Sequence, residues 1–309
     1  MLSVQAIQAY ARDGGRPLPR LTFKTYGDAE PVSCIIPFSR AGNLILIRAK
    51  ADTTEGNFIL DTGAPGLVLN MTYFRDYPST AEVNEEQSGI TGSVGSVRKT
   101  QVGLFSFGCI KTQAVAADLL NLGHLENTKG IRILGLIGLA QLQQYELIID
   151  YENSELHFRR SSKRELLSDR NPLLADTSTY STVSIEIWNH KLVTRTTLAG
   201  KKLRLMIDSG AESNLLDSRL PDKIFDNVEI LRRIQLTGTG EKKVEALYGN
   251  LNNLQIGNQS TGTLPVIITN LEKTCLAENS CIDGILGFDF LSLHKIGFNF
   301  VTHKMYIWK

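Results

Sequence analysis

The sequence carries one four-residue motif twice, once in each half of the chain. Asp61-Thr62-Gly63-Ala64 follows the apolar run 58–60, and Asp208-Ser209-Gly210-Ala211 follows the apolar run 205–207. A carboxylate placed directly after a buried strand costs free energy unless a partner or a reaction uses it. Because each half supplies one such carboxylate, the motifs predict two acids that folding brings together.

The repeat extends beyond these motifs. Residues 134–142 match residues 283–291, and residues 149–158 match residues 298–307, both at an offset of 149 positions. A long-period match of this kind indicates one structural unit that occurs twice, and 309 residues suffice for two such units. We therefore predict an N-terminal arm at 1–30, a first lobe at 31–160, a connector at 161–180 and a second lobe at 181–309.

Local patterns favour strands over helices. Short segments rich in branched residues and bounded by turn formers, such as 44–49, predict β-strands. The pairs 152–153 and 301–302 lie between strand-like runs and are interpreted as hairpin turns. Short helices are expected only after the apolar glycine motifs, at 140–145 and 288–294. The sequence thus predicts an all-β protein with short helices.

Composition and missing motifs exclude several classes of function. The formal net charge of +1 gives no large attraction to nucleic acid or to an anionic membrane. No apolar stretch approaches the roughly 18 residues that span a bilayer. The five histidines show no metal-ligand spacing, and no Cys-x-x-Cys pair or triphosphate-binding loop occurs. We therefore expect no metal, no cofactor, no nucleic-acid partner and no membrane span.

The four cysteines bear on the compartment. Cys275 and Cys281 lie six positions apart in a polar loop that a disulfide could close. Cys34 and Cys109 would form the second pair if both lie in the sheet of the first half. An even count in this layout favours an oxidising compartment, and the alternative is four thiols in a reducing cytosol. We expect a secreted or periplasmic protein whose signal peptide has been removed, with a cytoplasmic location as the alternative.

Two carboxyl groups a hydrogen bond apart can hydrolyse an amide without a metal or a covalent intermediate. Like charges at that distance cannot both ionise, so the pair holds one proton. The ionised member is a general base toward water, and the protonated member donates to the carbonyl oxygen. Thr62 and Ser209 carry small hydroxyls suited to bond the opposing loop. Gly63 and Gly210 allow backbone amides to approach the carboxylates closely.

Taken together, these elements resemble retropepsin-like aspartic proteases, in a form in which two such lobes are fused in tandem. The resemblance rests on the Asp-Thr/Ser-Gly-Ala motif, a glycine-rich stretch and an apolar-apolar-Gly motif, each present twice, and it covers about residues 31–309. It implies two β-barrel lobes with a central cleft, peptide or protein substrates, and a catalytic dyad of Asp61 and Asp208. It also implies flaps that close over bound peptide, with the candidates Ile90, Thr91, Gly92, Thr237 and Gly238.

Ala64 and Ala211 follow the two glycines, as in retropepsins. An alanine offers the carboxylates no hydroxyl hydrogen bond, and hydrogen bonds to a charged form lower its pKa. The dyad should therefore be less acidic than one flanked by hydroxyls. We expect activity at weakly acidic to near-neutral pH.

The leading interpretation is an aspartic endopeptidase that acts as a monomer, in which the two lobes form an intramolecular pseudo-dimer. The alternative is a catalytically inactive pseudo-protease whose cleft binds a peptide or a lipid-like ligand. A third interpretation has each lobe pairing with a second molecule.

Overall fold

The structure is a computed structural model that describes residues 33–83, 88–89, 92–93, 97–161, 171–237, 243–272, 275 and 281–309. The arm predicted at 1–30 lies outside these residues, as do the flap candidates Ile90, Thr91 and Gly238. No helix in the described part is long and apolar enough to cross a membrane.

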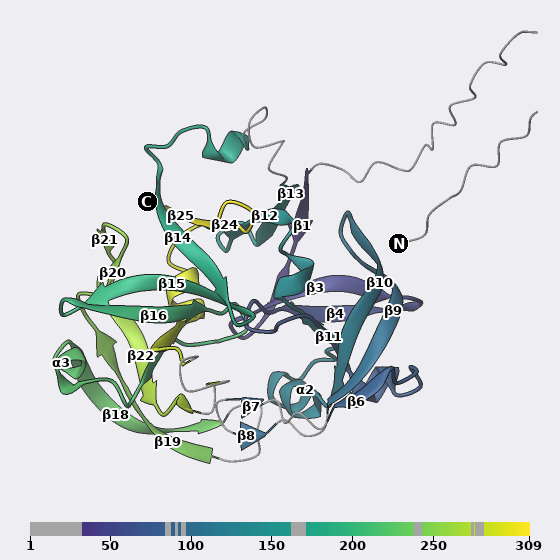
Figure 1. Cartoon of the computed structure of the whole chain (residues 1–309), viewed down its shortest axis with the longest axis horizontal. Helices are drawn as coiled ribbons and strands as arrows, with labels where there is room; N and C mark the ends of the chain where they lie inside the picture. Colours follow the sequence, from purple (N-terminus) through teal and green to yellow (C-terminus); the bar gives the residue numbers. More distant parts are fainter. Residues whose placement is uncertain are drawn as a thin grey trace, which may run out of the picture.

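The first half of the chain forms an eight-stranded sheet (Figure 1). The last three residues of its strand β4, Phe58, Ile59 and Leu60, are all buried. Asp61, which follows them, therefore begins at the buried end of this strand. The strands lie in the order β2 (Ser39–Ala41), β3 (Leu44–Ala51), β4 (Thr54–Leu60), β11 (Gly135–Ile137), β5 (Leu67–Asn70), β10 (Ile110–Leu120), β9 (Val97–Phe107) and β6 (Ala81–Val83). The short strands β7 (Ser88–Gly89) and β8 (Gly92–Ser93) pair separately.

Three short helical segments interrupt this sheet. They are α1 (Met71–Phe74), α2 (Gly123–Lys129) and the 3-10 turn η1 (Leu139–Gln141). The side chain of Asn70 caps α1 by accepting from the Thr72 amide at 3.2 Å. Gly130 ends α2 in the left-handed region at φ 66°, where glycine carries no Cβ penalty.

The second half repeats this pairing. Strand β11 runs parallel to β4 and antiparallel to β5, and β23 has the same relation to β16 and β17. Its strands are β15 (Lys191–Leu198), β16 (Lys201–Ile207), β23 (Gly284–Leu286), β17 (Leu215–Asp217), β22 (Leu264–Thr269), β19 (Lys243–Leu251) and β18 (Val228–Thr237), with β20 (Gln255–Ile256) and β21 (Gln259–Ser260) beside β15. The helices are α3 (Asp222–Phe225) and α4 (Phe288–Leu291).

Six further strands, three from each half, lie side by side and continue through β15 into the strands of the second half, whereas the eight-stranded sheet of the first half is separate. Their order is β1 (Ser33–Pro37), β13 (Glu155–Arg160), β12 (Tyr145–Asp150), β24 (Ile296–Asn299), β25 (Lys304–Trp308) and β14 (Tyr180–Trp188), with the 3-10 turn η3 (Pro172–Leu174) before β14. The join is the antiparallel pair β12–β24, in which Leu147 lies opposite Phe298. Both side chains are fully buried in a core that continues into both lobes. Burying a side chain of this size stabilises the fold by about 1.5–3 kcal/mol.

The all-β class with two lobes and short helices is confirmed, and so are the hairpin turns at 152–153 and 301–302. The helices predicted at 140–145 and 288–294 are shorter than expected. The first is the 3-10 turn Leu139–Gln141, because strand β12 already begins at Tyr145. The second ends at Leu291. The predicted lobe boundaries stay a prediction.

The structure contains two disulfides, Cys34–Cys109 and Cys275–Cys281, which are the two predicted pairs. The condition attached to the first pair is wrong in detail. Cys34 lies in β1 of the joining sheet, whereas Cys109 lies in the turn between β9 and β10 of the eight-stranded sheet. The bond therefore ties two sheets together. Disulfides of this kind form and persist in oxidising environments.

Candidate active site

Two strand ends place Asp61 and Asp208. Asp61 directly follows β4, and Asp208 directly follows β16. The Asp61 amide donates to the Ile137 carbonyl at 3.0 Å, and the Asp208 amide donates to the Leu286 carbonyl at 3.0 Å. Each aspartate is thus held by the strand that carries the apolar glycine motif of its own lobe.

Thr62 and Ser209 exchange hydrogen bonds across the two lobes. The Thr62 amide donates to Ser209 Oγ at 3.0 Å, and the Ser209 amide donates to Thr62 Oγ1 at 3.0 Å. Thr62 Oγ1 donates to the Ile207 carbonyl at 2.9 Å, and Ser209 Oγ donates to the Leu60 carbonyl at 2.8 Å. Both residues are almost fully buried, at 1% and 2% exposed. This exchange fixes the two aspartate loops against each other.

The loop amides and glycines bring the two carboxyl groups together. Asp61 Oδ1 accepts from the amides of Gly63 at 2.9 Å and Ala64 at 3.0 Å. A Cβ atom on Gly63 would lie 2.5 Å from Asp208 Oδ2, and one on Gly210 would lie 2.5 Å from Asp61 Cγ. Each glycine therefore packs against the carboxyl group of the opposite lobe, and a side chain at either position would displace that carboxyl group.

The second carboxyl group is cradled in the same way. Asp208 Oδ1 accepts from the Gly210 amide at 2.8 Å, and the Ala211 amide, which donates to the Asp208 main-chain carbonyl at 3.2 Å, helps to lower the pKa of this carboxyl group. The side chains of Asp61 and Asp208 are hydrogen-bonded to each other.

Burial raises the pKa of both aspartates above the ordinary value of 3.8. The hydrogen bonds from Asp208 and from the amides of Gly63 and Ala64 offset only part of this effect on the pKa of Asp61. The nearby charge of Asp61 raises the pKa of Asp208 further. Since a hydrogen bond between two carboxyl groups needs a proton, the pair retains one proton to higher pH than an isolated aspartate and titrates as a unit.

Glycines also support both loops from below. A Cβ atom on Gly138 would collide with the carbonyl oxygen of Gly66, and one on Gly287 would lie 2.6 Å from the carbonyl oxygen of Ala211. The buried side chain of Asn214 accepts from the Gly287 amide at 2.9 Å. Asn214 is a supporting residue that the sequence analysis missed, because an asparagine six positions after an aspartate carries no distinctive signal.

One edge of the site carries a second contact between the lobes. Glu212 Oε1 is paired with Lys129 Nζ at the end of α2, and Glu212 Oε2 accepts from the Asn43 amide at 3.1 Å. Asn43 Nδ2 also donates to the Glu212 carbonyl at 3.3 Å. The sequence could not indicate this contact, because Lys129 and Glu212 are 83 positions apart and belong to no shared motif.

The predicted flaps are described only in part. Gly92 lies in β8, and Thr237 ends β18. The other three candidates, Ile90, Thr91 and Gly238, lie outside the described residues. In the part of the chain that the structure describes, no three His, Cys, Asp or Glu side chains gather as metal ligands.

Comparison with known proteins supports one part of this chain directly. A family model described as "Aspartyl protease" matches residues 194–290. No curated protein matches the chain. Among solved structures, Basic 7S globulin from soybean has 9% identity and a TM-score of 0.46, covering 90% of this chain and 95% of that one.

Conglutin gamma, a basic 7S globulin from lupine seeds, has 9% identity and a TM-score of 0.47, with the same two coverages of 90% and 95%. Likenesses this distant carry no argument about activity. The matched segment 194–290 holds Asp208 and Gly287 and is similar to an aspartyl protease domain.

Proposed function

We propose that the protein is an aspartic endopeptidase that hydrolyses peptide bonds with a dyad of Asp61 and Asp208. The observation that carries this proposal is the placement of the two carboxyl groups together, each packed against the glycine of the opposite motif and both with a raised pKa. The aspartyl protease match at 194–290 supports it for the second lobe. The internal repeat extends the same interpretation to the first.

In the proposed reaction, a water molecule lies between the two carboxyl groups and the substrate carbonyl. The ionised carboxylate takes a proton from this water, and the resulting hydroxide attacks the carbonyl carbon. The protonated carboxyl group donates its proton to the carbonyl oxygen, which gives a neutral tetrahedral diol. The protonated carboxyl group then gives its proton to the amide nitrogen while the ionised carboxylate takes a proton from a diol hydroxyl. The C–N bond breaks, the amine and carboxylic acid products leave, and the pair is again singly protonated.

The remaining motif residues support this chemistry without touching the reacting atoms. The hydroxyl exchange between Thr62 and Ser209 holds the two loops in register. Reactions of this kind lose rate steeply when catalytic groups are misplaced by about 1 Å. In our proposal the two glycine-rich stretches act as flaps that close over the bound peptide and exclude bulk water. Because one chain supplies both aspartates, the protein acts as a monomer.

The pKa of the dyad bears on the pH optimum of the proposed enzyme, and the two disulfides bear on its location. The raised pKa of both aspartates keeps one proton on the dyad to higher pH. We therefore propose an optimum at weakly acidic to near-neutral pH, and a pH–rate profile that peaks in strong acid would contradict this. The two disulfides support a secreted or periplasmic location.

The test is cleavage of a quenched-fluorescent peptide library by the purified chain between about pH 4 and pH 7. Asp61→Asn and Asp208→Asn should each abolish cleavage while the protein stays folded in a thermal melt. The matched control is Asp76→Asn, because Asp76 is exposed after α1 and outside the site. Full activity in both dyad variants would refute the proposal. A folded wild type that binds a statine-type analogue but cleaves nothing would favour the inactive binding protein instead.

A further inference from the structure

The two aspartate motifs differ at the residue that follows each alanine. Glu212 follows Ala211, whereas Pro65 stands at the equivalent position in the first motif. The Ala211 amide donates to the main-chain carbonyl of Asp208 at 3.2 Å, so Glu212 directly follows a residue that contacts this aspartate. Since consecutive Cα atoms lie about 3.8 Å apart, the backbone of Glu212 lies at the edge of the site.

Glu212 reaches across to the first lobe, where its carboxylate is paired with Lys129 and bonded by the Asn43 amide. Helix α2, which Lys129 ends, lies on the side of the first lobe that faces the second (Figure 1). The cation at the end of α2 also interacts favourably with the helix dipole. The pair therefore joins the edge of the dyad loop to the connection between strands β10 and β11.

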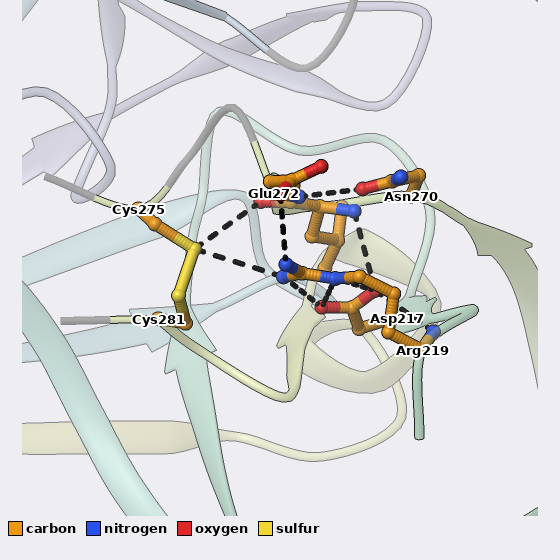
Figure 2. Close-up of polar contacts among 7 residues, drawn as sticks. Asp217, Arg219, Asn270, Glu272, Cys275 and Cys281 are labelled. Carbon is orange, nitrogen blue, oxygen red and sulfur yellow. Dashed lines mark hydrogen bonds and ion pairs between the residues drawn. A yellow bond between two sulfur atoms is a disulfide. The ribbon is translucent and has the colours of Figure 1, made fainter. Parts of the chain in front are cut away.

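The equivalent connection in the second lobe is built differently. It runs between β22 and β23 and contains the Cys275–Cys281 disulfide. Arg219 lies beside this loop and pairs with Asp217 at 2.6 Å and with Glu272 at 3.8 Å (Figure 2). Both acids belong to the same lobe as Arg219, so these ion pairs do not connect the two lobes. One end of the site thus has a charged contact between lobes, and the other end has Pro65.

The two members of the contact differ in their access to solvent. The Lys129 side chain is 11% exposed, whereas the Glu212 side chain is 39% exposed. Each carboxylate oxygen has two acceptor positions. Glu212 Oε1 bonds Lys129 with one of its positions, and Oε2 accepts from the Asn43 amide with one of its own. The group that a ligand can reach is therefore an acidic one with acceptor capacity left.

We propose that Glu212 is a specificity-determining residue that selects peptides with a lysine or arginine on one side of the scissile bond. This inference rests on the proposed endopeptidase function. The basic side chain occupies the end of the site next to α2 and places its cation against the exposed face of the Glu212 carboxylate. Lys129 weakens the attraction between the substrate cation and Glu212, because it neutralises part of the carboxylate charge. Pro65, at the equivalent position of the first motif, carries no charge that could act in this way.

The experiment uses matched peptides that carry lysine or its uncharged isostere norleucine at each position flanking the cleaved bond. Wild type should prefer lysine about three- to fivefold in kcat/KM on one side only, the size expected of a solvent-exposed ion pair. Glu212→Gln should abolish this preference. Lys129→Met should increase it, because the carboxylate loses its internal partner. High salt should weaken it.

The opposite directions of the two variants separate recognition from structure. A contact that only held the lobes together would lower activity on both peptides alike in both variants, which would overturn the inference. A wild type without a lysine preference would also overturn it. Glu186→Gln is the control, because Glu186 pairs with Arg195 on an exposed hairpin outside the site. A wild type that cleaves no peptide at all would refute the proposed function instead.

Discussion

The hydroxyl exchange at the centre of the molecule gives the sharpest test of how the lobes are held together. Ser209→Ala removes the donor to the Leu60 carbonyl and the acceptor of the Thr62 amide. Thr62→Val is close to isosteric, and it removes the donor to the Ile207 carbonyl and the acceptor of the Ser209 amide. Each substitution therefore leaves two buried backbone groups without these partners.

The expected cost follows from this count. A buried donor or acceptor left without a partner costs about 1–3 kcal/mol. Each single variant should therefore lower the free energy of unfolding by about 2–6 kcal/mol. The double variant should lose less than the sum of the two, because water can enter the interface once either hydroxyl is gone. Coupling between contacting residues is typically about 0.5–3 kcal/mol.

Urea denaturation of wild type, the two single variants and the double variant measures these values. The control is Thr263→Val, because the exposed Thr263 hydroxyl bonds Asn252 at 2.7 Å far from the interface. That change should stay within about 0.5 kcal/mol of wild type. If both interface variants behaved like this control, the exchange would not hold the lobes together and our reasoning about the site would fail.

Two further predictions concern pH and the disulfides. The pKa of Asp208 is raised in the folded state, so its contribution to stability is present below the unfolded pKa of 3.8 and is lost as pH rises. Asp208→Asn should therefore raise Tm relative to wild type more at pH 7 than at pH 4, and thermal melts across that range would show a constant difference if the shift were absent. Cys34–Cys109 spans 75 positions and Cys275–Cys281 spans six. Replacing both cysteines of one disulfide by serine should lower the free energy of unfolding, because the unfolded chain regains the entropy of the opened loop. The expected loss is about 4 kcal/mol for Cys34–Cys109 and about 2 kcal/mol for Cys275–Cys281. Equal urea midpoints for the two double-serine variants would contradict this account.

Much of the fold could be predicted because its signals are local. The turns at 152–153 and 301–302 lie between short strands whose composition already marks them. The hydrogen bonds between Thr62 and Ser209 could also be predicted, because both residues carry a small hydroxyl directly after a repeated aspartate. The repeat itself supplied the long-range information that a single motif lacks.

The contacts that could not be predicted join segments without a shared pattern. Nothing in the sequence places strand β12 against β24 or sets Cys34 and Cys109 in different sheets. The same holds for Lys129 and Glu212, whose pairing depends on the relative orientation of the two lobes. Helix lengths were overestimated because the start of the next strand, rather than helix propensity, ends η1.

The joining sheet shows where the two copies are free to differ. At the repeat offset of 149, Glu146 corresponds to Lys295, and Asp150 corresponds to Asn299. Lys295 and Asp150 form an ion pair at 2.6 Å. At the symmetry-related place, the Asn299 side-chain amide donates a hydrogen bond to Glu146 at 3.0 Å. A symmetric dimer would have to make the same contact twice. Here Glu146 also accepts from Asn171, directly before η3, at 2.5 Å, so only one of the two contacts also binds the chain before β14.

The same reasoning separates the centre of the candidate site from its edge. Sharing a proton requires two acids in closely similar surroundings, and the glycines and hydroxyls around Asp61 and Asp208 are correspondingly alike. A peptide, however, has a direction and different side chains on either side of the bond. A single chain can therefore keep its centre symmetric and vary its edge, as Glu212 and Pro65 do. Under the proposed function, this difference is what lets the site distinguish the two sides of its substrate.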